Sequence, residues 1–299
     1  MPYLLLALAA LFWSGNFVLG RAFHAELPPV GLAFWRWAAA LAILAPLALP
    51  RLRRAWPALR AARGRIAALA LLGVAGFNTF VYLGLQSTTT VNALLINATV
   101  PVLIVPLAWL SGIERPGPRP LAGALVSLAG VAWIMARGDP AALARLDVHA
   151  GDAWILLAAF CWAAYSLLLR RLPPGLDPLA FLLAIVALGV AVLAPLYLAE
   201  HLGGRAFPLT RASAAVVGYV ALFASVLAFV CWNHGIRAVG AARGGLFMHL
   251  MPVFGTVLAV LFLHERLHRY HLLGMLGVAA GIALATSRPR GRRKEEQAP

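Results

Sequence analysis

The chain has 299 residues, of which 62% are hydrophobic and only 12% are charged, and its mean hydropathy is +0.85. A soluble domain carries roughly a quarter charged residues, so this composition excludes an ordinary water-soluble protein and predicts an integral membrane protein. The formal net charge of +15 raises the question of a nucleic-acid partner, which the placement of the charges answers below.

Ten apolar stretches follow one another along the chain, each about 20 residues long, which is the length that crosses a hydrocarbon core of about 30 Å. None alternates polar and apolar residues as the strands of a membrane barrel do, so all ten are predicted to be helices. They lie at residues 3–23, 30–49, 66–86, 91–111, 119–137, 152–170, 179–199, 212–236, 244–263 and 270–287. The longest connections are expected at 50–65 and 138–152.

The sequence repeats itself at a nearly constant distance. LAPLAL at residues 44–49 returns as LAPLYL at 193–198, and Trp13 returns 149 residues later as Trp162. After two inserted residues the distance becomes 151, and these pairs recur: Gly84 and Gly235, Pro101 and Pro252, Glu114 and Glu265, Gly123 and Gly274, Gly130 and Gly281. We therefore predict a first repeat at 1–149, a second at 150–287, and a basic cytoplasmic tail at 288–299 that is disordered.

Each repeat contains five spans, which is an odd number. If all five cross the bilayer, the second repeat enters it in the opposite orientation to the first. Inverted repeats are typical of transporters, in which the substrate binds near the midplane between the halves. The predicted fold class is an all-α integral membrane protein with ten transmembrane helices, arranged as two inverted five-helix repeats.

The basic residues are placed asymmetrically. With a cytoplasmic N-terminus, 17 of the 25 Lys and Arg residues fall on the cytoplasmic side, in stretches 51–65, 115–119, 170–171, 237–243 and 288–294. The positive-inside rule then predicts a multi-pass protein with both termini in the cytoplasm, and the expected location is the bacterial inner membrane. The charge serves as an orientation signal and contacts anionic lipids. Nucleic-acid binding is not expected, because no RNA-binding motif accompanies the charge.

Polar and aromatic side chains inside the spans fall on single helix faces. Such groups are costly in lipid and usually face protein or a water-filled cavity, so we predict that these faces meet in one central cavity. For any one of these residues, a hydrogen bond to a neighbouring helix is the alternative. The predicted substrate-binding residues are Trp13, Asn16, Asn78, Tyr82, Asn97, Trp162, Tyr165, Ser166, Trp232 and His249.

Arg36 lies inside the second span and has no counterpart in the second repeat, where Ile185 stands. It either draws an anionic group toward the outer side of the cavity or pairs internally with carbonyl groups. The internal role is favoured, because an unpaired charge at this depth is costly. Separately, small-residue seams for close helix contact are expected at the glycines 123 and 130 and at 274, 277 and 281.

Residues 264–268 read HERLH and fit H-E-x-x-H, the zinc protease signature. An intramembrane zinc-dependent enzyme is therefore a remote alternative. The repeat argues against it, because Glu114 holds the corresponding place in the first half with no histidine near it. The motif also falls at the end of a span, whereas the chemistry needs it within a helix. We predict no metal site, no catalytic residues, no cofactor and no enzymatic activity.

Three segments resemble a known family. Residues 101–115 followed by Leu-Ala-Gly at 121–123, and 252–266 followed by His-Leu-Leu-Gly at 271–274, resemble the signature that closes each half of proteins in the drug/metabolite transporter superfamily, and more narrowly of its ten-helix EamA-type permeases. Residues 33–36, Ala-Phe-Trp-Arg, resemble the second-helix arginine signature of that family. The resemblance covers nearly the whole chain, and the aromatic faces favour the aromatic-amino-acid exporter branch.

The predicted function is a secondary transporter that exports small metabolites by alternating access. The favoured substrates are amino acids, including aromatic and large apolar ones. Aromatic rings would hold the apolar side chain and the ammonium group, and Asn16, Asn78 and Asn97 would orient the carboxylate and the amine. No nucleotide-binding motif is present, so ATP is not used directly. No acidic residue lies deep in a span, which leaves facilitated movement or weak proton coupling through His249.

Other cargoes of the same fold, namely nucleotide sugars and cationic drugs, remain alternatives, as does a channel or scaffold without alternating access. The expected partners are a small-molecule substrate and membrane lipids, and the chain is expected to be a monomer or a weak dimer.

Overall fold

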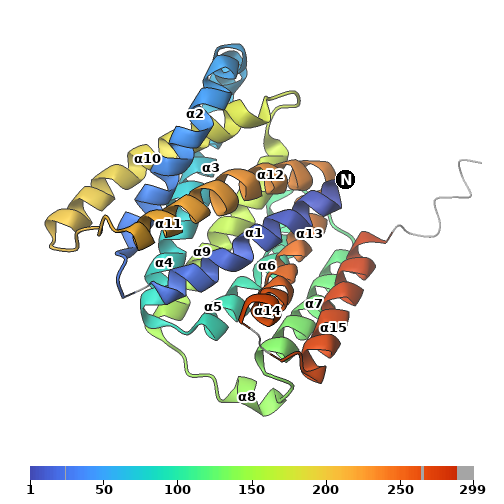
Figure 1. The fold of residues 1–299 in the computed structure, drawn as a ribbon. Helices are drawn as coiled ribbons and strands as arrows, with labels where there is room; N and C mark the ends of the chain where they lie inside the picture. Colours follow the sequence, from blue (N-terminus) through green and yellow to red (C-terminus); the bar gives the residue numbers. More distant parts are fainter. Residues whose placement is uncertain (24, 264–265, 288–299) are drawn as a thin grey trace, which may run out of the picture.

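A computed structural model describes residues 1–23, 25–263 and 266–287, and every regular element in this part of the chain is a helix (Figure 1). Within these residues, nine helical stretches are long and apolar enough to cross a membrane, and a shorter apolar helix covers Pro2–Asn16. The predicted all-α membrane protein is thereby confirmed, with nine to ten spanning helices. The predicted tail, 288–299, lies outside the described residues.

The first half of the chain contains α1 (Pro2–Ala22), α2 (Pro29–Ala61), α3 (Arg63–Leu69), η1 (Ala70–Gly76), α4 (Phe77–Ser87), α5 (Thr90–Asn97), α6 (Val100–Ser111), α7 (Pro118–Met135) and α8 (Pro140–Ala144). The third predicted span is thus one continuous stretch formed by α3, η1 and α4, and the fourth is divided between α5 and α6. The short helix α8 lies in the connection between the halves.

The second half contains α9 (Ala150–Leu168), η2 (Leu169–Arg171), α10 (Pro178–Leu202), α11 (Arg211–Tyr219), η3 (Val220–Leu227), α12 (Ala228–Val239), α13 (Ala241–Gly244), η4 (Gly245–His249), α14 (Leu250–Leu263) and α15 (Arg269–Thr286). Its eighth span repeats the construction of the third, because a π-helix, η3, is again inserted in the middle of the stretch.

Helix α2 is longer than expected. The sequence predicts a span at 30–49 and a connection at 50–65, but the helix continues to Ala61 and has 33 residues. At 1.5 Å per residue it is about 50 Å long, well beyond the thickness of the hydrocarbon core. Pro50 and Pro57 lie inside it. The extension persists because Ala55 and Leu59 are buried against the core, a tertiary contact that outweighs the missing proline N–H groups.

Helices α7 and α15 pack against each other in antiparallel orientation. Gly123 lies against Gly281, and Gly130 lies against Gly274, so the residue order along the two helices is opposite. A Cβ atom on Gly123 would lie 2.5 Å from the carbonyl oxygen of Gly281. Only glycine permits so close an approach of two backbones, and the predicted glycine seam is confirmed.

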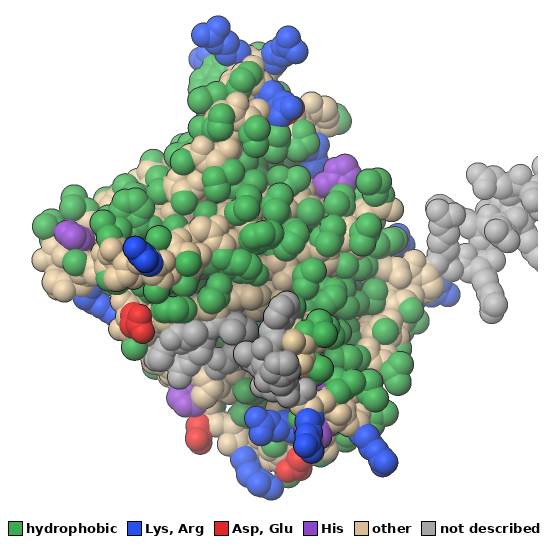
Figure 2. Space-filling view, viewed as in Figure 1, with side chains coloured by type: hydrophobic (Ala, Val, Ile, Leu, Met, Phe, Trp, Pro, Cys, Tyr) green, Lys and Arg blue, Asp and Glu red, His purple; other side chains and the backbone are tan. Residues whose placement is uncertain are grey.

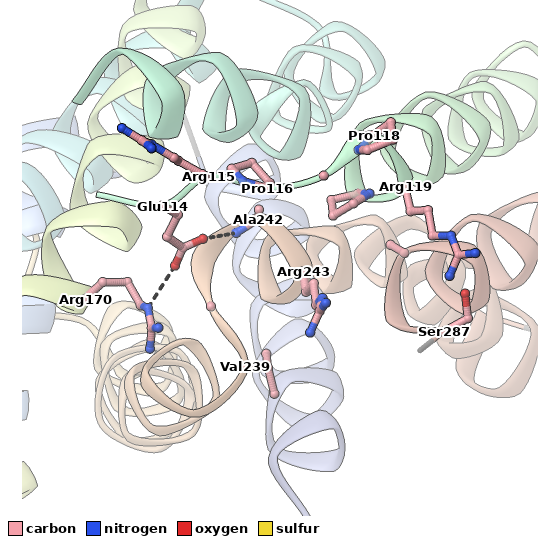
Figure 3. Close-up of a pocket in the computed structure, with 14 residues that line it drawn as sticks. Glu114, Arg115, Pro116, Pro118, Arg119, Arg170, Val239, Ala242, Arg243 and Ser287 are labelled. Carbon is pink, nitrogen blue, oxygen red and sulfur yellow. Dashed lines mark hydrogen bonds and ion pairs between the residues drawn. The ribbon is translucent and has the colours of Figure 1, made fainter. Parts of the chain in front are cut away.

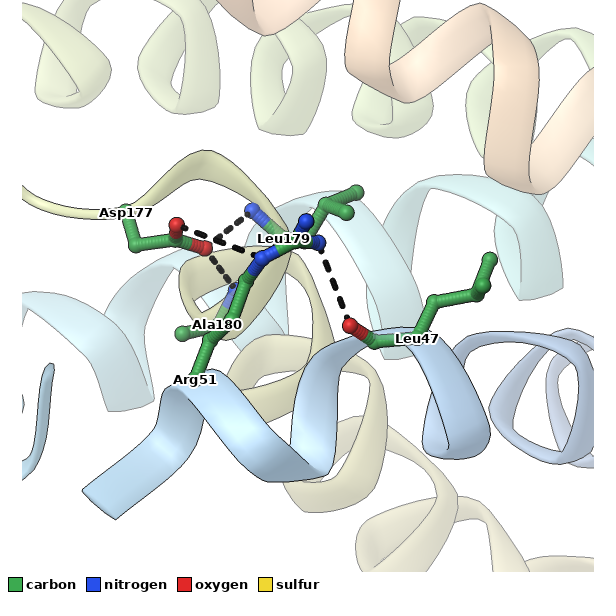
Figure 4. Close-up of polar contacts among 5 residues, drawn as sticks. All are labelled: Leu47, Arg51, Asp177, Leu179 and Ala180. Atoms are coloured by element: carbon green, nitrogen blue, oxygen red, sulfur yellow. Dashed lines mark hydrogen bonds and ion pairs between the residues drawn. The ribbon is translucent and has the colours of Figure 1, made fainter. Parts of the chain in front are cut away.

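Helices α2 and α10 are also antiparallel neighbours. At one end, Glu200 accepts a hydrogen bond of 2.6 Å from the backbone N–H of Gly31 at the start of α2. At the other end, Asp177 lies 3.9 Å from Arg51, and its carboxylate also caps the first turn of α10 (Figure 4). The contacting residues therefore occur in opposite order along α2 and α10, as antiparallel packing requires.

The remaining central helices of each half pack against helices of the other half. Helix α1 lies beside α12, where Gly235 packs on Leu6, and α4 packs on α9, where Gly84 packs on Ile155 (Figure 1). Leu6 and Ile155 are 149 positions apart, and the two glycines are 151 positions apart, which are the repeat distances of the sequence. The same contact is therefore made twice, each time between the first span of one half and the third span of the other.

The start of α1 and the end of α15 lie at the same end of the bundle (Figure 1). Two arginine side chains of η2 donate to backbone carbonyls of other segments there: Arg170 donates to the carbonyl of Arg237, and Arg171 donates to the carbonyl of Ser111 at 3.0 Å. Figure 2 shows hydrophobic side chains over the middle of one face, with most Lys and Arg side chains toward its margins. This distribution fits a protein whose middle lies in lipid.

Candidate substrate site

An aromatic cluster occupies the centre of the seam between the halves. The ring of Trp162 lies 5.0 Å from the ring of Trp13, 5.0 Å from Tyr165, 5.6 Å from Trp232 and 5.3 Å from Phe229, centroid to centroid. These side chains come from α1, α9 and α12, and all five are buried. The structure thus brings together the four aromatic residues that the sequence predicts on those three helices, and adds Phe229.

Arg36 of α2 lies beside this cluster, with its side chain fully buried. Its guanidinium donates to the side-chain oxygens of four residues: Asn16 at 3.3 Å, Asn78 at 2.7 Å, Tyr82 at 2.8 Å and Ser225 at 2.8 Å from Nη2 and 3.0 Å from Nε. Nη2 also donates to the backbone carbonyl of Ala224 at 3.3 Å. Arg36 is therefore paired internally, as the sequence favoured. Most of its acceptors are side-chain oxygens rather than backbone carbonyls.

All of these acceptors are neutral. Among the described residues, the ion pairs are formed by other arginines, and no carboxylate contacts Arg36. Amide, hydroxyl and carbonyl dipoles offset only part of the free energy that a buried cation loses on leaving water. The centre of the seam is therefore electropositive.

Two tyrosine–asparagine hydrogen bonds lie at related positions in the two halves. Tyr82 donates to the Oδ1 atom of Asn16 at 2.8 Å, and Tyr165 donates to the Oδ1 atom of Asn233 at 2.8 Å. Asn16 corresponds to Tyr165 at the repeat distance of 149, and Tyr82 corresponds to Asn233 at 151. Each half therefore makes the same hydrogen bond with the two residue types reversed. Of the two pairs, only that of the first half bonds to Arg36.

The π-helix η3 places a carbonyl at the site. In a π-turn the hydrogen bonds run to the fifth residue back, which displaces carbonyl groups from their α-helical partners, and such turns often occur at functional sites. The carbonyl oxygen of Ala224 accepts from Trp13 Nε1 at 2.9 Å and also from Arg36. The Oγ atom of Ser225 donates to the carbonyl of Val220, five residues back, at 2.8 Å. No feature of the sequence predicts these π-turns.

Some indole N–H groups at the site have a hydrogen-bond partner among the described residues, and others have none. Trp232 Nε1 donates to Ser166 Oγ at 3.2 Å, which adds one more of the predicted residues to the cluster. By contrast, Nε1 of Trp162 and Nε1 of Trp37 are buried and have no hydrogen-bond partner in the described part of the chain. The site therefore holds a buried positive charge and two unpaired N–H donors. Ser225 and Asn233 lie on the same face of the eighth span as Trp232, and sequence reasoning counted that face as lining the cavity. It nevertheless left both residues, and Arg36, out of the predicted binding set, although the repeat distance relates Asn233 to Tyr82.

The structure places Asn97 and His249 in a different polar group. His249 Nε2 lies 2.7 Å from the carbonyl oxygen of Ala98, and Nδ1 lies 2.7 Å from Ser127 Oγ. Because a carbonyl only accepts, Nε2 carries the proton and Nδ1 accepts from the hydroxyl. Asn97, at the end of α5, is buried, and its Oδ1 atom has no hydrogen-bond partner among the described residues. A substrate-binding role for these two residues stays a prediction.

The predicted central cavity is filled with side chains in this conformation. Trp13 is 6% exposed, and Trp162, Tyr165 and Trp232 are 0% exposed. A substrate would therefore reach these groups only if the surrounding helices moved apart.

A pocket of about 510 Å³ opens at the end of the bundle where the chain begins (Figure 3). At its rim Glu114 accepts a hydrogen bond of 2.8 Å from Arg170 Nε, and others of 2.8 and 3.2 Å from the backbone N–H groups of Ala241 and Ala242. One carboxylate of the first half thus joins two segments of the second half, η2, which follows α9, and the start of α13.

The H-E-x-x-H alternative is not tested by this geometry. Its residues 264 and 265 lie outside the described residues. In the described ranges, no group of three or more His, Cys, Asp or Glu side chains could hold a metal ion.

Comparison with known proteins identifies the family. The EamA-like transporter family matches the chain twice, over residues 1–136 and 149–287. An uncharacterized transporter of Archaeoglobus fulgidus is 28% identical over 96% of this chain and 97% of its own length. A probable terminal-alkyne amino-acid exporter of Streptantibioticus cattleyicolor is 30% identical over 77% of this chain and 76% of its own.

A crystal structure with 23% identity superposes with a TM-score of 0.73 and covers 95% of this chain and 96% of that chain, which shows the shared fold. The resemblance to EamA-type permeases that the sequence motifs indicated is confirmed. The family and these relatives are transporters, which supports a non-enzymatic role.

Proposed function

Because the chain belongs to the EamA-like transporter family and is a multi-pass membrane transporter, we propose that it exports amino acids, including aromatic and large apolar ones. The observation that carries this proposal is the buried group at the seam, in which aromatic rings adjoin a guanidinium, amides and hydroxyls. An amino acid has complementary parts, an apolar side chain and two polar groups. The relative named as a probable amino-acid exporter supports the same substrate class.

The aromatic cluster would hold the side chain of the substrate. Rings of Trp13, Trp162 and Trp232 present apolar faces, and the same faces attract an ammonium group. The amides of Asn16 and Asn78 lie next to this surface and supply hydrogen bonds of defined direction.

We further propose that residues 1–149 and 150–287 are inverted halves that rock about this site. The antiparallel pairs α2–α10 and α7–α15 support this arrangement, because inversion makes equivalent helices of the two halves run in opposite directions. The doubled contacts of Leu6 with Gly235 and of Ile155 with Gly84 support it as well. Arginines gathered at the end where α1 begins support cytoplasmic termini.

We propose that the substrate crosses by facilitated transport rather than by transport strongly coupled to protons. Both ring nitrogens of His249 are held in short hydrogen bonds, which favours a structural role for this residue. Glu114 and Arg170 form an ion pair that is partly exposed at one end of the bundle.

Counterflow in proteoliposomes tests the proposed function. Vesicles preloaded with unlabelled L-phenylalanine should accumulate labelled L-phenylalanine and L-leucine transiently and saturably, whereas a channel gives no overshoot. A labelled nucleotide sugar and a lipophilic cation serve as the competing cargoes. Counterflow of either one, with none of the amino acids, would replace the proposed substrate class.

A further inference from the structure

We propose that Arg36 binds the carboxylate of the transported molecule and thereby selects carboxylates over amines of the same shape. This inference deepens the proposed function, on which it rests, by assigning the charge that the substrate must carry.

The first support is the missing counter-ion. Arg36 is fully buried, and each of its acceptors in the described part of the chain is a neutral amide, hydroxyl or carbonyl oxygen. An anion stabilises a buried guanidinium better than neutral dipoles do, because two opposite full charges attract more strongly than a charge and a dipole, and a carboxylate can accept two parallel hydrogen bonds. A substrate carboxylate would provide the negative charge that the described residues do not place at Arg36.

The second support is the geometry of the guanidinium. Its Nε and Nη2 atoms form the edge that binds a carboxylate through two parallel hydrogen bonds. In this structure both atoms donate to one oxygen, Ser225 Oγ, at 3.0 and 2.8 Å. A single hydroxyl therefore stands where the two oxygens of a carboxylate would fit.

The third support is that the hydrogen-bond acceptors of Arg36 are divided between the two halves of the chain. Nη1 is held by Asn16, Asn78 and Tyr82, which belong to the first half, as does Arg36 itself. The partners of the other edge, Ser225 and the carbonyl of Ala224, belong to the second half. If the halves separate, the first half keeps the guanidinium oriented while its carboxylate-binding edge becomes free.

The unpaired indole donors give independent support. Nε1 of Trp162 and Nε1 of Trp37 are buried without a partner among the residues that the structure describes, and the guanidinium of Arg36 lies 5.1 Å from the ring of Trp37. Leaving a buried N–H unpaired is unfavourable, and a ligand rich in acceptor oxygens relieves that cost. An amine ligand would bring further donors to a site that already has donors in excess.

The test compares ligands that share one ring and differ in charge. Binding of 3-phenylpropionate, L-phenylalanine and phenylethylamine to the purified full chain is measured by ligand-induced thermal stabilisation and by tryptophan fluorescence. Both carboxylates should bind at least about tenfold more tightly than phenylethylamine, because only they can form the charge-assisted pair. The preference is a ratio measured on one preparation, so it does not depend on the amount of folded protein.

Variants of the arginine and of its hydroxyl partner sharpen the test. Arg36→Gln should weaken carboxylate binding about 30- to 100-fold, and Arg36→Lys should weaken it less, because a lysine keeps the charge but not the two-point geometry. Ser225→Ala removes the competing hydroxyl and should tighten binding of 3-phenylpropionate. If Arg36→Gln does not fold, the lysine and alanine variants and the wild-type preference still decide the question.

Each result has a defined meaning. Phenylethylamine binding as tightly as 3-phenylpropionate, an unchanged preference in Arg36→Gln, or no carboxylate binding at all would overturn the inference. Tighter binding of phenyl phosphate would assign the edge to a phosphate-bearing molecule instead and overturn the carboxylate assignment. Arg36-dependent binding of 3-phenylpropionate without counterflow of any amino acid would leave this inference standing while the proposed function fails.

Discussion

Arg170 Nε donates a hydrogen bond of 2.8 Å to Glu114 Oε1, and this ion pair joins the two halves of the chain at one end of the seam. The carboxylate also accepts from two backbone N–H groups at the start of α13. Both side chains are only partly exposed, so solvent weakens the pair less than it weakens a surface pair. When this end of the transporter opens, these contacts must break.

Glu114→Gln should loosen this end of the bundle. The amide keeps one acceptor oxygen but loses the charge, which should lower the free energy of unfolding by about 1 kcal/mol and favour opening. A cysteine placed at Val239, which lines the adjoining pocket, should react with a membrane-impermeant thiol reagent several-fold faster in the Gln variant. Background labelling of Cys161 and Cys231 is measured separately.

Asp139→Asn is the matched control for that experiment. It removes a carboxylate from an exposed ion pair with Arg145, at 3.9 Å, away from the seam. Labelling at the same introduced cysteine should not change. An equal increase in both variants would mean that loss of charge, rather than this contact, controls access.

Trp13→Ala and Trp162→Ala should each reduce counterflow of L-phenylalanine at least about tenfold, because burial of an aromatic side chain against other rings accounts for a large share of its binding free energy. Folded protein is quantified in each preparation by size-exclusion chromatography. Trp56→Ala is the control, since that side chain is 57% exposed on the extension of α2. Normal rates in the first two variants would remove the aromatic cluster from the site.

Gly123→Ala should destabilise the protein by about 1–3 kcal/mol, because the new Cβ meets the backbone of α15, which cannot yield as a flexible side chain can. Gly218→Ala in α11 is the matched control, because its Cβ would have no neighbour within 4 Å. The control should be neutral or gain up to about 1 kcal/mol from the higher helix propensity of alanine. Thermal unfolding in detergent measures both, and equal effects would contradict the packing argument.

The reversed tyrosine–asparagine pairs predict a rescue. Tyr165→Asn or Asn233→Tyr alone breaks the hydrogen bond and should cost about 1 kcal/mol or more. The double variant recreates the arrangement seen between Asn16 and Tyr82 in the first half, so it should recover much of that stability. A double-mutant cycle measures the coupling, which should be about 0.5–1.5 kcal/mol. Purely additive losses would show that the two positions are not equivalent.

The helices were largely predictable, and their ends less so. Runs of apolar residues of bilayer length satisfy their backbone hydrogen bonds in lipid only as helices, which is why helices lie at the predicted spans, nine of them long and apolar enough to cross a membrane among the described residues. The exception is α2, where prolines at 50 and 57 suggest a loop. The stretch is helical instead, because Ala55 and Leu59 are buried against the core. Such a contact between distant segments cannot be read from the local sequence.

The site was predictable in its parts but not in its connections. The polar faces of α1 and α4 predicted Asn16, Asn78 and Tyr82, which do meet. Their common partner, Arg36, was recognised as unusual, but nothing in the linear pattern indicated which oxygens would surround it. His249 was assigned to the same group, and its partners proved to be Ala98 and Ser127 instead.

The sequence by itself determined that this chain is a membrane protein built from nine to ten apolar helices, and that its second half repeats the pattern of its first. Those properties follow from hydropathy and spacing, which act along the chain. Only the tertiary structure decided that a π-turn would offer the carbonyl of Ala224 to two donors, and that Arg36 would be buried among neutral oxygens from both halves. Such contacts depend on how helices far apart in sequence approach one another, because a hydrogen bond requires two groups to lie within about 3 Å.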